Sequence, residues 1–357
     1  MTQDAYDRTV VVMGTFVTIT VIGHGEDEQQ ITHRAEAVER AFEWFRAIEA
    51  RCTRFDPASE LMQLTQRTGI AVPASPILFE AVQFALAVAD ESGGAFDPTV
   101  GREMEARGFS REHRTGMIVR TRLEPQGAAS HRDVVLDPAK RTITLLRPLI
   151  LDLGSVAKGL AIDTAVRELR PFTNFAIDAG GDLYLGGRPP ESDRWSVGIR
   201  HPTQEGQLID AIRVTDRAVC TSGDYERPAP GGVAGHHILD PRAGISANTV
   251  ASVTVVAPTA MLADAVATAA FVLGPVEGLR FIDRFGVDGF IVSPALERYA
   301  TRGMSRDYEL RQENSKAADA GPAIPANAKG PAADHPGAAD RDRVARRGRP
   351  SGRAKSR

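Results

Sequence analysis

The sequence predicts an α+β fold with largely antiparallel or mixed sheets and packed helices. Apolar strand patterns and helical patterns come in blocks and not in strict alternation, which favours α+β over a doubly wound parallel sheet. The chain is 42% hydrophobic and 25% charged, as in soluble globular proteins. Its 357 residues are enough to form one large hydrophobic core, or two lobes that share one hydrophobic core. We expect one folded domain over residues 1–311.

The N-terminal part carries the clearest periodicity. Thr9–Val21 alternates and is rich in Val, Ile and Thr, which predicts a strand broken at Met13-Gly14. Apolar residues recur every three to four positions in Gln29–Arg51 and again in Ile77–Val88, so both are predicted helices. The pattern from Asp90 to Asp133 is weak and predicts a short helix with loops.

The rest of the domain is predicted to contain short strands and three helices. The expected strands are two in Val134–Leu151, Asn174–Ile177, Leu183–Leu185, Trp195–Arg200, Ala211–Val214, Ala218–Thr221, Ala251–Val256, Gly289–Val292 and Met304–Leu310. The expected helices are Ser155–Leu169, Ala260–Leu273 and Val276–Phe285.

Residues 312–357 have a different composition from the domain. Ala, Pro, Gly, Asp and Arg dominate and no aromatic residue occurs, so we expect disorder. Ten Lys/Arg against four Asp/Glu give residues 315–357 a net charge of +6 and leave −9 on residues 1–314. That balance argues against a nucleic-acid-binding core. The basic tail could touch an anionic surface, but a solvated segment without a role is the favoured interpretation.

The chain as written predicts a cytoplasmic protein without a membrane span. Its polar start has neither the basic and apolar regions of a leader nor a lipid-attachment cysteine. No window reaches the roughly 18 apolar residues of a spanning helix. Cys52 and Cys220 allow at most one disulfide, and both are interpreted as small buried hydrophobic residues.

Six short motifs, in one order, carry the chemistry. They combine small residues, which let a backbone approach a ligand, with carboxylates and hydroxyls, which are hard ligands of the kind Mg²⁺ prefers. A site for a phosphate-bearing ligand and a cation is therefore predicted. The motifs are Gly94–Thr99, Leu151–Gly159, Asp178–Asp182, Thr221–Tyr225, His237–Arg242 and Ala263–Thr268.

Two of these motifs fall at predicted helix starts. Asp264 and Thr268 are four residues apart and share one helical face among small neighbours; a cap or dipole partner is the alternative for Asp264. The junction from Asp152 to Lys158 offers free N–H groups to a phosphate. Ser155 is a natural N-cap, and a surface role is the alternative for Lys158.

The remaining motifs suggest a flat ligand and a base. Asp178–Asp182 joins two strands, either as a tight turn or as backbone pressed against a flat ligand. His237 has the best context for a general base, with a pKa of about 6.5 that nearby carboxylates would raise. His236 should point the opposite way. We expect the other histidines on the surface: His24, His33, His113, His131, His201 and His335.

With these motifs in view, the chain resembles the ApbE family, the FAD:protein FMN transferases. The similarity covers roughly residues 9–310 and includes Met13–Thr15 and Arg54–Leu61 besides the motifs above. The resemblance implies an ApbE-like fold, FAD as substrate, Mg²⁺ as cofactor, and transfer of FMN to a Thr or Ser hydroxyl of a target flavoprotein with release of AMP.

The resemblance also implies site residues. His237 matches the base. The positions that match FAD contacts are Met13, Phe55, Ala95, Phe96, Asp97, Asp152, Lys158 and Ile238, and those that match the metal site are Ser155, Asp264 and Thr268. Two positions depart from the family: Phe55 stands where tyrosine is common, and Ala267 where some members have aspartate. Family members are often periplasmic, whereas this chain has no leader as written.

Three alternatives remain open from the sequence. The same site would serve an Mg²⁺-dependent FAD pyrophosphatase with water as acceptor, and a flavinylated product would separate the two. A non-catalytic FAD-binding protein is less favoured because Asp264, Thr268 and His237 are present. A scaffold with this fold would not bind FAD at all.

Overall fold

A large antiparallel sheet forms the centre of the molecule. The computed structural model describes residues 3–24, 28–112, 116–121, 127–227, 229–230, 235–309 and 324–325. Every neighbouring pair of strands in this eight-stranded sheet is antiparallel, as the sequence predicts. In order across the sheet its strands are β1 (Gln3–Val12), β2 (Thr15–His24), β6 (Phe175–Ala179), β7 (Asp182–Gly186), β10 (Arg217–Gly223), β13 (Ser252–Ala257), β14 (Asp288–Val292) and β15 (Arg298–Ala300).

Both faces of this sheet are covered, so its central strands are apolar on both sides. In β13, Val255 and Ala257 belong to one core, and Val256 between them belongs to the other. The alternation follows from the period of two in a strand. The larger core lies under the helices and the smaller one under β8 (Trp195–Arg200) and β9 (Leu208–Val214).

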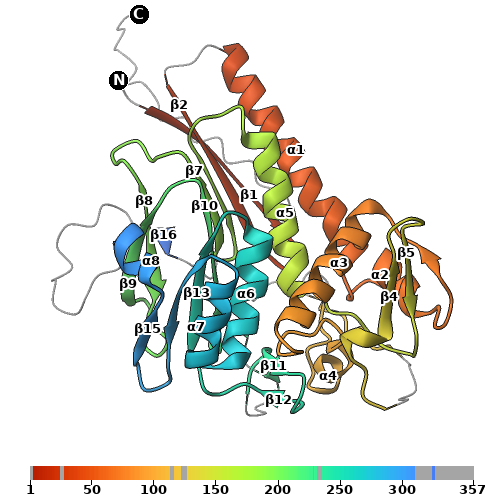
Figure 1. Cartoon of the computed structure of the whole chain (residues 1–357). Helices are drawn as coiled ribbons and strands as arrows, with labels where there is room; N and C mark the ends of the chain where they lie inside the picture. Colours follow the sequence, from red (N-terminus) through yellow and green to blue (C-terminus); the bar gives the residue numbers. More distant parts are fainter. Residues whose placement is uncertain are drawn as a thin grey trace, which may run out of the picture.

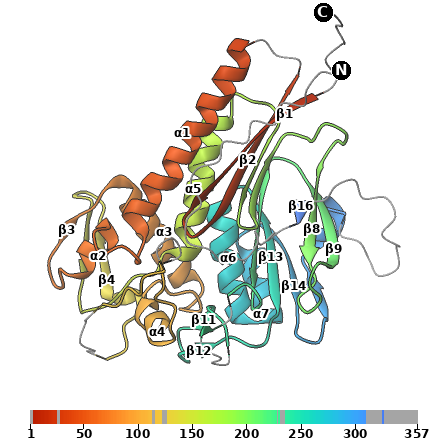
Figure 2. The same cartoon turned by 180° about the vertical axis from the view of Figure 1, so that it is seen from behind.

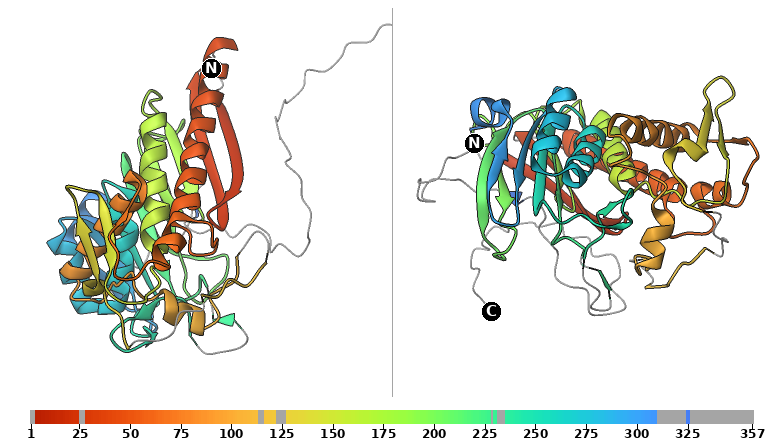
Figure 3. Two further views of the ribbon diagram at one scale, coloured as in Figure 1. Left: turned by 90° about the vertical axis from the view of Figure 1, so that its right-hand side faces the viewer. Right: turned by 60° about the horizontal axis from the view of Figure 1, so that its bottom comes forward.

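Four helices cover one face, and they lie side by side along the strands (Figures 1 and 3). Their buried residues follow the helical repeat; in the first of them Val38, Phe42 and Phe45 are fully buried. Seen from behind, β8 and β9 cover the opposite face (Figure 2). The helices are α1 (Glu28–Cys52), α5 (Gly154–Leu169), α6 (Ala260–Leu273) and α7 (Pro275–Arg284).

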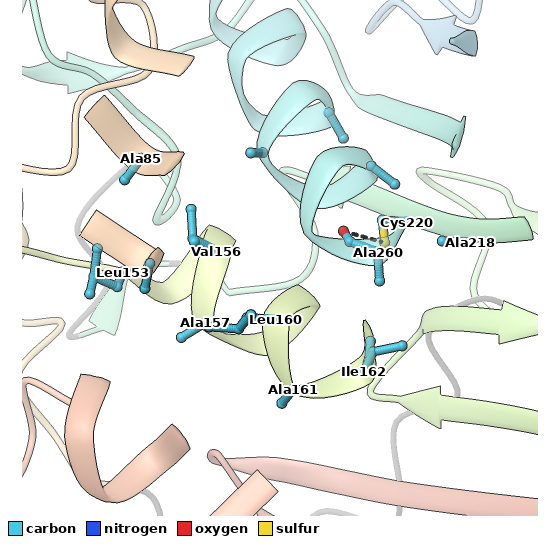
Figure 4. Close-up of a cluster of buried hydrophobic side chains, with 14 of the residues drawn as sticks. Ala85, Leu153, Val156, Ala157, Leu160, Ala161, Ile162, Ala218, Cys220 and Ala260 are labelled. Carbon is cyan, nitrogen blue, oxygen red and sulfur yellow. Dashed lines mark hydrogen bonds between the residues drawn. The ribbon is translucent and has the colours of Figure 1, made fainter. Parts of the chain in front are cut away.

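Helices α5 and α6 approach each other very closely at a glycine. A Cβ atom at Gly159 would lie 2.4 Å from the Cα atom of Met261, so no side chain fits there. Apolar residues around this contact, among them Val156 and Leu160, fill the space between α3, α5 and α6 (Figure 4). The Cys220 thiol donates to the carbonyl of Ala260 at 3.6 Å in the same region.

A smaller unit extends beyond the lower ends of α1 and α5 (Figure 1). Its three-stranded sheet has the order β3-β5-β4. Its elements are α2 (Glu60–Thr65), β3 (Val72–Pro73), α3 (Pro76–Glu91), α4 (Gly101–Ala106), the 3₁₀ turn η1 (His131–Asp133), β4 (Val134–Asp137) and β5 (Thr142–Leu145).

One predicted strand is wrong. It is expected over Met304–Leu310, but residues 304–307 belong to the helix α8 (Arg302–Asp307). Met304 and Tyr308 both pack on the smaller core. Their spacing of four residues fits one helical face as well as it fits alternation, and the helical arrangement prevails.

The remaining described elements are two short hairpin strands and one pair of residues from the C-terminal segment. The hairpin is β11 (Leu239–Asp240) with β12 (Ile245–Ser246). Residues Ile324–Pro325 form β16, which pairs in parallel with β8. The predicted disorder over 312–357 otherwise falls outside the described residues. None of the helices in the described part of the chain is long and apolar enough to cross a bilayer.

Candidate active site

Two adjoining cavities lie between the helical layer and the smaller unit. The first, of about 430 Å³, is lined by residues from α4, α5, α6, β10 and the hairpin β11–β12. The second, of about 390 Å³, is lined by the turn at Met13-Gly14 and the end of α1. The structure brings all twelve sequence-predicted site residues to these cavities: Met13 lines the second, and the other eleven line the first.

The predicted metal residues lie close together on one wall of the first cavity. Asp264 and Thr268 project from α6, and the Thr268 hydroxyl lies 3.2 Å from the Ser222 hydroxyl of β10. Asp264 is only 6% exposed, and its Oδ2 accepts no hydrogen bond from any described residue. Burial raises the pKa of Asp264, and the nearby Lys158 ammonium partly offsets that effect.

Lys158 lies between two buried carboxylates. Its ammonium contacts Asp182 Oδ2 and lies 3.6 Å from Asp264 Oδ2. Asp182 is 2% exposed and lies at the start of β7. The surface role considered for Lys158 is therefore excluded, and Asp182 is a site residue that the sequence motif contained without revealing its partner.

The segment that leads into α5 is held by Asp152. Its Oδ1 accepts the N–H of Gly154 at 2.8 Å, and its Oδ2 accepts Arg54 Nε at 2.6 Å. Burial alone would raise the pKa of Asp152, but Arg54 and the Gly154 N–H hold it below its usual value. The expectation that Ser155 is the N-cap is wrong: α5 begins at Gly154, and Ser155 lies inside it with non-helical angles.

The opposite wall is built from the loop after α3. The Phe96 N–H donates to Ser92 Oγ at 3.0 Å. The Asp97 carboxylate accepts the N–H and hydroxyl of Thr99 on Oδ1 and the His131 N–H on Oδ2, at 2.7 to 2.9 Å. These protein donors engage both carboxylate oxygens, so Asp97 chiefly fixes the shape of this loop.

His131 is buried and not on the surface as the sequence suggests. Its Nδ1 lies 2.9 Å from Asp97 Oδ2 and its Nε2 lies 3.1 Å from Asp90 Oδ1. The available signal is Ser130 and Asp133, which cap the turn η1 reciprocally. That pattern predicts a local turn and does not predict its contact with a loop 34 residues away.

Arg54 and Phe55 separate the two cavities and line both. Arg54 is 4% exposed and donates to the Phe109 carbonyl at 2.5 Å as well as to Asp152. Its guanidinium lies 4.2 Å from the centre of the Phe55 ring, which fixes that ring as a flat surface. Arg54 is a further site residue that the sequence-based list lacks.

His237 faces the first cavity, whereas His236 faces away from it. Nδ1 of His236 accepts the Ile238 N–H and its Nε2 donates to the Ala247 carbonyl at 2.6 Å. His237 Nδ1 has no hydrogen-bond partner among the described residues. Burial, Arg227 and His236 lower the pKa of His237 to about 3. The predicted upward shift from nearby carboxylates is therefore wrong, because burial and two neighbouring basic groups outweigh them.

Met13 and Ile238 complete the predicted contacts. Met13 has a positive φ of 54° in the turn between β1 and β2, and its N–H donates to Glu49 Oε1 at 2.9 Å. Ile238 is 5% exposed and lies beside His237 on the cavity wall. Cys52 and Cys220 are both free and buried, as predicted.

Comparisons with known proteins agree on one family. The ApbE family model matches residues 13–291. The FAD:protein FMN transferase of Treponema pallidum is 31% identical over 322 residues, covering 84% of this chain and 87% of the relative. The protein of that name from Haemophilus influenzae is 27% identical and covers 80% of this chain and 87% of the relative.

Solved structures share the fold. The ApbE protein of Thermotoga maritima superposes with a TM-score of 0.73 at 28% identity, covering 85% of this chain and 99% of that one. The flavin transferase ApbE of Vibrio cholerae, at 24% identity and a TM-score of 0.71 over 85% of this chain and 99% of its own, supports the fold alone. Taken with the extent of the family match, these likenesses show that the chain belongs to the ApbE family.

Proposed function

We propose that this chain transfers the FMN part of FAD to a Thr or Ser hydroxyl of an acceptor flavoprotein and releases AMP. The observation that carries the proposal is the pair of cavities joined where Lys158, Asp152 and the start of α5 lie. A dinucleotide has two ring systems joined by a pyrophosphate, and such a ligand matches two cavities with charged groups between them. The curated relatives bear the name of this activity.

The donor set of the first cavity fits Mg²⁺. No cluster of three His, Cys, Asp or Glu side chains that could hold a metal ion exists among the described residues. Mg²⁺ usually keeps several waters and takes one or two carboxylates together with substrate phosphates. Asp264, Thr268 and Ser155 would hold the ion on one side, and the Oδ2 of Asp264, which accepts no hydrogen bond from a described residue, is available for it. When bound, the ion would neutralise charge that develops on the phosphates.

The protein residues have distinct parts in the proposed transfer. The acceptor oxygen bonds to the phosphorus of the FMN half, and the bond from that phosphorus to the bridging oxygen breaks with its electron pair leaving on AMP. The hydroxyl proton passes to the His237 imidazole, which is neutral at physiological pH because its pKa is lowered. The bound pyrophosphate is an anion nearby and would make this imidazole more basic. Lys158 supplies positive charge beside the pyrophosphate.

The test separates transfer from hydrolysis and from binding alone. The chain is incubated with FAD, Mg²⁺ and a purified flavoprotein domain bearing a candidate acceptor threonine, with its Thr→Ala variant as control. We expect AMP in the solution and flavin fluorescence on the acceptor band in a denaturing gel, absent from the control. Free FMN with AMP and no labelled band would identify a pyrophosphatase. Bound FAD without AMP would identify a binding protein.

A further inference from the structure

The passage between the two cavities is defined by the residues that line both. They are Arg54, Phe55, Asp152, Gly154, Lys158 and Arg227. Three of these six are cations, and one is a carboxylate. A ligand that occupies both cavities has to place its middle part here, and for a dinucleotide the middle part is the pyrophosphate.

Two of the three cations are already bound by the protein. Arg54 is buried and donates to Asp152 and to the Phe109 carbonyl. Lys158 contacts Asp182 and lies beside Asp264. Arg227, by contrast, is exposed, and no ion pair or side-chain hydrogen bond links its guanidinium to another described residue. Its positive charge is free for a ligand.

The surroundings of Arg227 place it at the reacting groups. Its carbonyl accepts the His237 N–H at 3.1 Å, so the two residues are tied through the main chain. It lines the first cavity together with His237, Asp152 and Asp264. Arg227 is therefore close to the carboxylates and the imidazole at once.

We propose that Arg227 binds the pyrophosphate of the dinucleotide in the passage between the cavities and neutralises charge on the AMP leaving group. This inference rests on the proposed function and adds to it a residue that the sequence motifs did not single out. A guanidinium can donate two parallel hydrogen bonds to phosphate oxygens. In the transfer written above, these bonds would strengthen as the electron pair moves onto the AMP phosphate.

The test compares ligands with and without phosphate. Dissociation constants for FAD and for riboflavin are measured by flavin fluorescence on the full chain, for wild type, Arg227→Met and Arg227→Lys. Arg67→Met is the matched control, because Arg67 is exposed and lines neither cavity. Since the Arg227 side chain is exposed, its variants should fold, and a melting curve checks this.

We expect Arg227→Met to weaken FAD binding about 10- to 100-fold, the size of a lost hydrogen bond to a charged group, and to leave riboflavin binding unchanged. Arg227→Lys should recover part of the loss, and Arg67→Met should show none. Equal losses for FAD and riboflavin would indicate a role in cavity shape and overturn the proposal, as would unchanged FAD binding. Because these are binding measurements, they remain decisive if wild type binds FAD but performs no transfer. Absence of FAD binding by wild type would contradict the proposed function itself.

Discussion

The two walls of the first cavity are held in different ways. Lys158 and Asp264 stand on long helices that pack on an eight-stranded sheet, and their positions follow from the contact between α5 and α6. The loop carrying Phe96 and Asp97 is held by hydrogen bonds to Ser92 and His131. Under the proposed function, we expect the charged residues on the two helices to act in the chemistry and the loop of Phe96 and Asp97 to shape a surface for the ligand. Substitutions on the first should change rate, and substitutions on the second should change affinity.

The largest effect is expected at Asp264. Asp264→Asn removes the carboxylate proposed for Mg²⁺ and should lower the transfer rate by about 10³-fold or more, while FAD still binds. Chelation of Mg²⁺ with EDTA should have the same effect on wild type. Asp283→Asn, at an exposed position on α7, is the control. Full transfer by the Asp264 variant at controlled Mg²⁺ would rule out its metal role.

The second-largest effect on the transfer rate is expected at His237, which lines the same cavity. His237→Gln should slow transfer about 10²- to 10⁴-fold, with FAD affinity little changed, because the imidazole is proposed to accept the proton of the acceptor hydroxyl and not to bind FAD. His236 is unsuitable as a control because it is buried and bonded on both ring nitrogens. His201→Gln, outside the cavity walls, replaces it. Loss of FAD binding in the His237 variant, with the rate retained at saturation, would assign this residue to the ligand site.

The pH profile sharpens this second prediction. Since the pKa of His237 in the free protein is about 3, kcat/KM should show no fall from His237 between pH 8 and pH 5. The unfolded chain takes up this proton near its ordinary pKa of about 6.5. Because the folded protein takes up this proton only near pH 3, wild type should lose stability as the pH falls from about 6.5 towards 3, and His237→Gln should lose less. An acidic limb near pH 6.5 that disappears in the variant would contradict the burial of this imidazole.

A substitution that loosens the loop of Phe96 and Asp97 should lower the affinity for FAD. His131→Ala leaves the Asp97 carboxylate without its imidazole partner while the backbone hydrogen bond remains. Loss of one hydrogen bond to a charged group typically costs about 1.5–3 kcal/mol, so we expect FAD affinity to fall roughly tenfold with kcat nearly unchanged. His33→Ala, exposed on α1, is the control. A large fall in kcat at saturating FAD would show that the loop also positions reacting groups.

A smaller effect on activity, but a clear one on stability, is expected at Asp163. Its carboxylate accepts the N–H groups of Ala260 and Met261 at 2.7 and 3.0 Å and so caps the start of α6 from α5. Burial raises its pKa to about 6. Asp163→Ala should lower the free energy of unfolding by about 1–3 kcal/mol, measured in urea. Asp283→Ala serves as the reference, and equal stability of the two variants would refute the cap.

The sequence predicts the elements of the helical wall well because their periodicity is strong. The expected helix Ala260–Leu273 has the observed bounds, and the i, i+4 spacing of Asp264 and Thr268 places both on one cavity. The motif residues come together because the antiparallel strands bring β7, β10 and β13 side by side. Local sequence patterns therefore predict the helix α6 and the position of its two site residues.

Contacts between segments that are distant in the chain cannot be predicted from local sequence patterns. His131 lies in a weak pattern, and only the folded chain brings it to Asp97. The pKa of His237 depends on burial and on Arg227 and His236, none of which acts through a readable motif. Arg54 is readable as part of a motif, but its role in holding Asp152 and the Phe55 ring depends on packing.

The close approach at Gly159 has a consequence for protein engineering. Replacing a helix glycine by alanine is a standard way to stabilise a protein, since glycine costs a helix interior about 1 kcal/mol. At position 159 the added methyl would meet the main chain of α6 and push the two helices apart. Lys158 and Asp264 sit on these helices, so the spacing of their charges would widen with them. This glycine acts as a spacer of minimal thickness, and thermostabilised variants of this enzyme should retain it.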